Sequence, residues 1–164
     1  RILFNDVGVG MFQHDDDLVC LQKFFDKASN PDANLWMIDA VVWDNPPQGD
    51  AVALHWDKIH ALDTKRQYVP HQIDSLIVEL PEGFSGGSMN FYDYSNSDPS
   101  KAEKGVREPD SVVAPEVNKL VTVRGDAYQS VKGFSGTGRF VQVDLHQFII
   151  PQHLVKLTPD FRVM

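Results

Sequence analysis

Short stretches rich in apolar residues recur through most of the chain, and residues that favour turns separate these stretches. Short apolar runs bounded by such residues are typical of strands. We predict strands, or strand–turn–strand units, at 36–43, 73–80, 88–94, 118–131 and 138–145. Successive short strands with turns between them favour an antiparallel sandwich or barrel. The glycine-rich segments 81–87 and 133–138 predict a turn and a hairpin, respectively.

The front of the chain predicts helical support for these strands. Arg1–Phe12 fits an irregular strand, and the acidic run Asp15–Asp17 lies where a helix N-terminus favours negative charge. Four apolar residues follow at helical spacing: Leu18, Leu21, Phe24 and Phe25. We expect this stripe to pack on the sheet and Asn30–Pro31 to end the helix. Cys20 is the one cysteine, and we expect it to pack on this helix as a small apolar residue.

His55 and Asp57 are the strongest candidates for chemistry. Side chains two residues apart on an extended strand share a face, so this imidazole and this carboxylate can meet one metal ion while Trp56 points away. Two histidines and one carboxylate on one face of Fe(II) leave coordination positions open for a co-substrate and oxygen. A site of this kind requires a third ligand from a segment further along the chain.

The segments that follow Asp57 resemble those of the Fe(II)/2-oxoglutarate-dependent oxygenases of the prolyl-hydroxylase type. An apolar strand, a Gly-Gly turn and a second strand come in the family's order, the segment 118–131 resembles the one that carries the distal ligand, and 138–145 resembles the closing strand. The resemblance runs from about Leu35 to about Ile150. It implies a mainly β fold with an N-terminal helix, in which the strands form a double-stranded β-helix, the jelly roll also found in cupins.

The resemblance also implies roles for individual residues. His55 and Asp57 would bind Fe(II), and Gln129 would occupy the place of the third ligand. Arg139, ten residues after Gln129, would pair with the distal carboxylate of the co-substrate 2-oxoglutarate. The implied activity is that of a dioxygenase that hydroxylates a protein side chain or a small molecule.

The chain departs from the family's pattern at two positions. Gln129 stands where the family has its second histidine, and an amide oxygen is a weaker donor to Fe(II) than an imidazole. Val141 stands where members with an Arg-x-Ser pattern use a serine hydroxyl as a second carboxylate contact. Three alternatives remain open: an active hydroxylase, a pseudoenzyme that keeps the fold for binding or scaffolding, and an enzyme whose distal histidine was deliberately replaced.

Other candidate residues favour structural roles. We expect His60 to lie in the loop after the His55 strand, and His146, which shares the parity of Asp144, to make a structural hydrogen bond. Tyr128 should face away from the metal by strand alternation. The long polar stretch Ser95–Asp110 predicts either a lid near the site or a solvated loop.

Length and composition favour one compact domain. The 164 residues divide into helical and strand support at 1–34, a β core at 35–150 and a C-terminal extension at 151–164. The chain begins with Arg1 rather than Met, so we expect a trimmed form or a fragment of a larger protein.

The charge of the chain restricts its partners. With 15 basic and 23 acidic residues the formal net charge is −8, which disfavours generic binding to nucleic acid or to an anionic membrane. No apolar run approaches the roughly 18 residues of a membrane span. The partner that the resemblance implies is a protein or small-molecule substrate, and the oligomeric state is open. One cysteine fits a reducing intracellular compartment without fixing the location.

Overall fold

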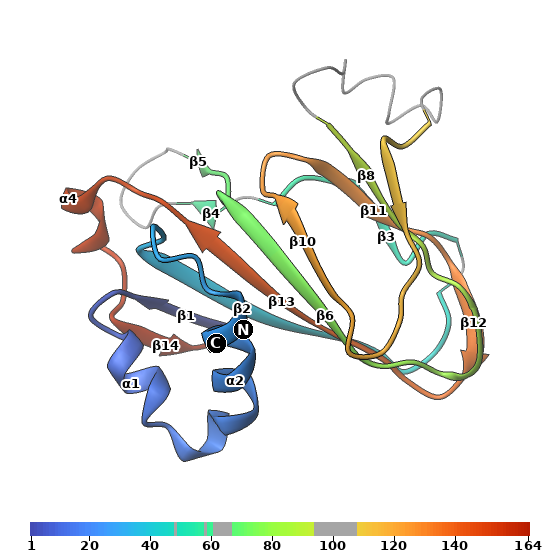
Figure 1. The fold of residues 1–164 in the computed structure, drawn as a ribbon, viewed down its shortest axis with the longest axis horizontal. Coiled ribbons are helices and arrows are strands. Elements are labelled where there is room, and N and C mark those ends of the chain that lie inside the picture. Colours follow the sequence, from blue (N-terminus) through green and yellow to red (C-terminus); the bar gives the residue numbers. More distant parts are fainter. Residues whose placement is uncertain (48, 58, 61–66, 94–107) are drawn as a thin grey trace.

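The computed structural model describes residues 1–47, 49–57, 59–60, 67–93 and 108–164. Figure 1 shows two antiparallel β-sheets that face each other. The larger sheet contains, in spatial order, β10 (Leu120–Arg124), β6 (Gln72–Glu79), β13 (Phe140–Phe148), β2 (Leu35–Trp43), β1 (Ile2–Asn5) and β14 (Phe161–Val163). The smaller sheet contains β3 (Val52–His55), β11 (Tyr128–Val131), β8 (Met89–Tyr92) and β9 (Ser111–Val113).

The chain passes back and forth between these sheets. β2 lies in the larger sheet and β3 in the smaller one, and β6 and β8 repeat this step. The strands β10, β11 and β13 then continue the alternation. This winding is that of a double-stranded β-helix. The predicted jelly roll, mainly β with an N-terminal helix, is confirmed.

Two short strand pairs form separate two-stranded sheets among the described residues. β4 (Ile59–His60) pairs with β5 (Gln67–Tyr68), and β7 (Glu82–Gly86) pairs with β12 (Phe134–Thr137). The predictions of a turn at 81–87 and of a hairpin at 133–138 were therefore wrong. The two glycine-rich segments pair with each other, and the approach is close, because a Cβ on Gly86 would lie 2.6 Å from the carbonyl oxygen of Gly133.

The N-terminal segment covers the outer face of the larger sheet. It contains α1 (Val9–Gln13), a turn of 3₁₀-helix (Asp16–Leu18) and α2 (Val19–Ala28), and the carboxylate of Asp15 caps the 3₁₀ turn by accepting from the backbone N–H of Asp17. Phe24 and Phe25 are buried against the sheet, as the helical spacing predicts. Cys20 lies on the helix α2, as expected, but it is exposed, so the expectation that it packs there as a small apolar residue was wrong.

Strand alternation gives β13 two different faces. Val143 and Leu145 pack with Phe25 under the helices, while Phe140 packs with Ile77 between the two sheets. The even-numbered residues of β13 therefore point into the space between the sheets, where the pocket lies.

The C-terminal residues form α4 (Gln152–Val155) and β14, which pairs with β1. Among the described helices, none has the length and apolar character needed to cross a membrane. The polar stretch predicted to be a lid or a solvated loop lies, up to residue 107, outside the described residues.

Candidate functional site

A polar pocket lies between the two sheets. Its volume is about 140 Å³, and its lining comprises Asp39, Val41, Trp43, Val52, His55, Asp57, Ser75, Gln129, Val131, Gln142, Asp144 and His146. The pocket is smaller than the roughly 300–1,000 Å³ typical of sites for small organic ligands. It has room for an ion and a few water molecules.

His55 and Asp57 meet in this pocket, as their spacing predicts. His55 ends β3, and the Nε2 atom of its ring lies 3.8 Å from Oδ2 of Asp57. The other ring nitrogen, Nδ1, lies 2.9 Å from the carbonyl oxygen of Ala53. Because a carbonyl can only accept, Nδ1 carries a proton, and in the neutral ring the lone pair is then on Nε2, which faces Asp57. Trp56 points the other way and stacks on Tyr128.

Gln129 reaches the same pocket from the neighbouring strand. It is the register partner of His55 in the β3–β11 pair, so the two side chains emerge side by side. Its side-chain N–H₂ donates a hydrogen bond to Oδ2 of Asp57. In this arrangement Gln129 holds the carboxylate in place, and its amide oxygen is turned away from the carboxylate.

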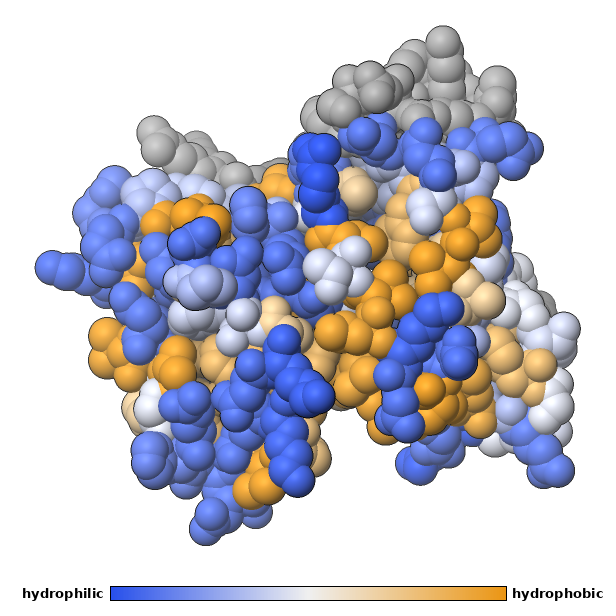
Figure 2. All heavy atoms as spheres, in the orientation of Figure 1, coloured by the Kyte–Doolittle hydropathy of each residue, from blue (hydrophilic) through white to orange (hydrophobic). Residues whose placement is uncertain are grey.

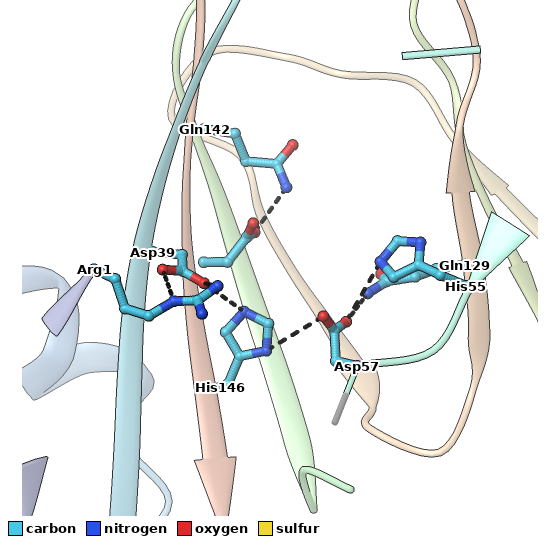
Figure 3. Close-up of polar contacts among 8 residues, drawn as sticks. Arg1, Asp39, His55, Asp57, Gln129, Gln142 and His146 are labelled. Atoms are coloured by element: carbon cyan, nitrogen blue, oxygen red, sulfur yellow. Dashed lines mark hydrogen bonds and ion pairs between the residues drawn. The ribbon is translucent and has the colours of Figure 1, made fainter. Parts of the chain in front are cut away.

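His146 enters the pocket from the opposite sheet, which sequence reasoning did not anticipate. Nδ1 of its ring lies 3.9 Å from Oδ1 of Asp57, and Nε2 lies 3.9 Å from Oδ2 of Asp39. Figure 3 shows Asp57 between His146 on one side and His55 with Gln129 on the other. The expected hydrogen bond at His146 is absent at Nδ1, which is buried and has no hydrogen-bond partner among the described residues.

A second acidic group supports His146 from behind. Asp39 on β2 forms a bidentate pair with the guanidinium of Arg1, in which the two N–O distances are both 2.7 Å. Arg1 therefore fixes the orientation of the carboxylate that faces Nε2 of His146.

Asp144 adds a third carboxylate to the pocket. It accepts a hydrogen bond from Nε2 of Gln142 at 2.7 Å. Burial raises the pKa of Asp144, because the charged form loses its hydration, although hydrogen bonds from Ser75 and Gln142 and the nearby His146 oppose this rise. The pocket thus gathers the acidic groups of Asp39, Asp57 and Asp144.

Arg139 lies outside the pocket. Its guanidinium donates to Glu79 at 3.0 Å, and its side chain is 59% exposed. Arg139 precedes β13 and is odd-numbered, like Val141 and Val143 on that strand. The residues of β13 that line the pocket are even-numbered: Gln142, Asp144 and His146. Arg139 was expected to reach the site, and in the structure it does not. The offset of ten residues from Gln129 sets its position along the chain, but it does not determine which face of the strand the side chain is on.

Two larger hollows lie away from this pocket. One of about 680 Å³ is lined in part by His71, Arg124 and Asp126, and the other, of about 340 Å³, lies between β8, β9 and β10. Figure 2 shows apolar residues gathered in the middle of the face that is viewed, over the ribbon position of β10 and β8 in Figure 1. Neither hollow includes His55 or Asp57, so the chemistry concentrates in the smaller pocket.

Comparison with known proteins gives a distant structural likeness. No family model matches the chain, and no curated protein matches it. The chain is similar to the crystal structure of an oxidoreductase of the 2OG-Fe(II) oxygenase family from Burkholderia pseudomallei, with 12% sequence identity and a TM-score of 0.45. The similarity covers 87% of this chain and 55% of that chain, so this chain spans about half the length of that protein. A likeness this distant does not carry an assignment of function.

The donors of the pocket suit a metal ion better than they suit 2-oxoglutarate. An imidazole nitrogen beside a carboxylate is a pair of ligands that Fe(II) accepts once the nitrogen is unprotonated. As the described side chains lie, no group of three His, Cys, Asp or Glu residues is close enough to hold a metal ion, so binding requires the pocket to close. Within the described part of the chain, the pocket offers a dicarboxylate acidic side chains and no arginine or lysine that is free of a partner, since Arg1 is paired with Asp39.

Proposed function

We propose that the chain is an oxygenase-type jelly-roll domain whose pocket binds Fe(II) through His55 and Asp57. The observation that carries the proposal is the orientation of the His55 ring. Its Nδ1–H is held by the carbonyl of Ala53, and this directs Nε2 toward Asp57. With Fe(II) bound, such a site supplies oxygen activation for hydroxylating a protein side chain or a small molecule, with 2-oxoglutarate as co-substrate.

The charge of the pocket supports a cation as the bound species. Asp39, Asp57 and Asp144 line one small cavity, and Asp39 alone has an arginine partner there. A divalent cation lowers the energy of this arrangement, because it attracts the carboxylates and favours the charged form of Asp144, which burial disfavours. The same charges oppose the entry of a dicarboxylate, and 2-oxoglutarate would bind only if the pocket opened and Arg139 left Glu79.

A non-catalytic binding domain of the same fold is the second candidate. Two contacts favour this candidate. Gln129, which stands in the place of the third ligand, uses its N–H₂ group to donate a hydrogen bond to Asp57. Arg139 pairs with Glu79 outside the pocket. In this alternative the domain keeps the metal and the fold, and lacks the co-substrate anchor.

An anaerobic calorimetric titration with Fe(II) tests the metal proposal. The native protein should bind one equivalent, and Asp57→Asn should weaken binding by more than about tenfold, because it removes the anionic ligand. The matched control is Asp32→Asn, since Asp32 is exposed and lies outside the pocket. If the native protein binds no Fe(II), or if Asp57→Asn binds as well as the control, the proposal is wrong.

Succinate formation from 2-oxoglutarate then separates the two candidates. An active oxygenase should form succinate in an iron-dependent reaction, and Arg139→Ala should weaken 2-oxoglutarate binding if the guanidinium swings into the site. A protein that binds Fe(II) but forms no succinate, and whose affinity for 2-oxoglutarate does not depend on Arg139, would be the non-catalytic form.

A further inference from the structure

We infer that the groove between β9 and β10 binds an extended segment of another protein. The segment pairs with the free edge of β10 and places apolar side chains between the two sheets. The inference deepens the proposed function and rests on it in treating the bound segment as the substrate, since it selects a protein over a small molecule. The groove has a volume of about 340 Å³, which falls within the roughly 300–1,000 Å³ typical of sites for organic ligands.

Two strands at the edges of their sheets form the sides of the groove. β10 is the outermost strand of the larger sheet on one side, and β9 is the outermost strand of the smaller sheet. Among the described residues, β10 pairs only with β6 and β9 pairs only with β8. An unpaired strand edge presents a row of N–H and C=O groups that can pair with an added chain. The groove therefore offers hydrogen bonds to an extended segment as well as space for its side chains.

The hydrogen bonds of β10 show which of its backbone groups face the free edge. In an antiparallel pair, alternate residues direct both their N–H and their C=O toward the partner strand. On the side of β6, Gly125 donates to the carbonyl of His71, and the carbonyl of Lys119 accepts from Ile77. The odd-numbered residues of β10 therefore bond to β6. The residues whose backbone groups face the free edge are Leu120, Thr122 and Arg124.

Apolar side chains line the groove from both sheets. Val121 and Val123 come from β10, Phe91 comes from β8, and Val113 comes from β9. Apolar residues gather over β10 and β8 in Figure 2. A segment added beside β10 would direct alternate side chains into the same space, because alternate residues of neighbouring strands share a face. The groove therefore favours a segment with an apolar residue at every second position.

The groove begins one strand away from the polar pocket in each sheet. In the smaller sheet, Gln129 of the pocket is the register partner of Phe91, which lines the groove. In the larger sheet, Ser75 of the pocket is the register partner of Val121, which also lines the groove. Neighbouring strands lie about 5 Å apart, so a segment added to β10 would lie roughly 10 Å from Ser75. About three further residues of extended chain span that distance and bring the substrate to the pocket.

The charge at one end of the groove selects the kind of segment. Among the described residues that line the groove, Asp93, Asp110 and Asp126 are acidic and Arg124 is basic. Arg124 pairs with Asp126 at 2.5 Å and lies 3.9 Å from Asp93, so these charges are close together. Three carboxylates and one guanidinium give this end a formal charge of −2, in a chain whose net charge is −8. A segment with lysine or arginine after its apolar residues therefore complements the groove better than an acidic segment does.

Fluorescence anisotropy with two synthetic peptides tests the inference, in solutions without added metal. Both peptides alternate valine with threonine over about six residues, and one ends in a pair of lysines while the other ends in a pair of glutamates. The lysine peptide should bind more tightly by about threefold or more, as expected for exposed charges. Asp126→Lys should remove this difference, because it brings the formal charge at that end of the groove to zero. The matched control is Asp32→Lys, which changes an exposed residue outside the groove and should preserve the difference.

Leu120→Pro tests the pairing with β10. Proline removes one N–H from the free edge and none from the side of β6, so binding of the lysine peptide should weaken by about fivefold or more. Leu120→Ala is the matched control, because it shortens the same side chain and keeps the N–H. A lysine peptide with N-methylated backbone should bind as weakly to the native protein, and this measurement covers the case in which Leu120→Pro does not fold.

Several results would overturn the inference. The native protein might be found to bind neither peptide, or to bind the N-methylated peptide as well as the unmodified one. Equal binding of the lysine and glutamate peptides would also overturn it. Sedimentation of the native protein as a dimer that Leu120→Pro dissociates would show that a second copy of the chain occupies the edge instead.

The inference and the proposed function fail in different ways. A protein that binds Fe(II) but neither peptide would overturn the inference and leave the proposed function standing. A protein that binds the lysine peptide but no Fe(II) would overturn the proposed function and leave the groove as a site for peptides.

Discussion

Asp74→Ala should destabilise the protein strongly, because Asp74 is the acceptor of a buried hydrogen-bond network. The residue is 1% exposed on β6. Its carboxylate accepts from Thr122 at 2.5 Å, from Gln147 at 2.5 Å and from Gln72 at 2.8 Å. Gln147 also donates to the carbonyl of Ala28 at the end of α2, so the network joins three strands to the helix that covers them.

The magnitude follows from the number of bonds and their burial. Hydrogen bonds to charged groups contribute about 1.5 kcal/mol or more each, so three of them contribute about 4 to 5 kcal/mol. Relief from burying a charge offsets part of this loss. We therefore expect the free energy of unfolding to fall by about 3 kcal/mol, a large part of the stability of a domain of this size.

Urea unfolding of a double-mutant cycle measures the effect. Asp74→Ala and Thr122→Val are made singly and together, and the coupling free energy should be at least about 1.5 kcal/mol. Asp32→Ala is the control, since it is exposed and should change stability by less than about 0.5 kcal/mol. Additive effects at Asp74 and Thr122 would refute the reasoning, because they would show that the two side chains do not depend on each other.

Three further predictions concern packing and the surface. Phe4→Ala should lower the free energy of unfolding by about 3 to 5 kcal/mol in urea, because Phe4 is 0% exposed in the core under the helices. Gly8→Ala should lower the free energy of unfolding by about 2 kcal/mol or more, since the new Cβ would lie 1.5 Å from the backbone oxygen of Asp160. Gly10→Ala is the control and should not destabilise the protein, because nothing lies within 4 Å of its Cβ. Arg139→Ala should change the thermal stability by less than about 1 kcal/mol, because its ion pair is exposed, and a larger loss would indicate a contact beyond that pair.

Local patterns predicted the parts of the fold that depend on neighbours in sequence. The apolar stretches became β2, β6, β10, β11 and β13, and the acidic run became the cap and first turn before α2. His55 and Asp57 were predictable for the same reason, because two residues on one strand share a face whatever the rest of the chain does.

The remaining features depend on register between distant strands. Which face of β13 points into the pocket follows from its pairing with β2 and β6, and no local pattern fixes that choice. Local pattern therefore predicted neither that Arg139 lies outside the pocket nor that His146 lines it. The pairing of β7 with β12 was not predicted, for a related reason. Glycine-rich segments favour turns unless another backbone lies close enough to pair with them.

The central position of β13 affects how the protein can be synthesised. β13 lies between β2 and β6, and its register partners on β2 are roughly a hundred residues earlier in the chain. While the ribosome is still adding the preceding residues, β2 and β6 have emerged with unpaired edges, which are templates for pairing with other chains. The larger sheet and the pocket can form only after β13 arrives. Newly made chains should therefore be most prone to aggregate just before Phe140–Phe148 leaves the ribosome, and any product truncated ahead of this strand should remain in that state.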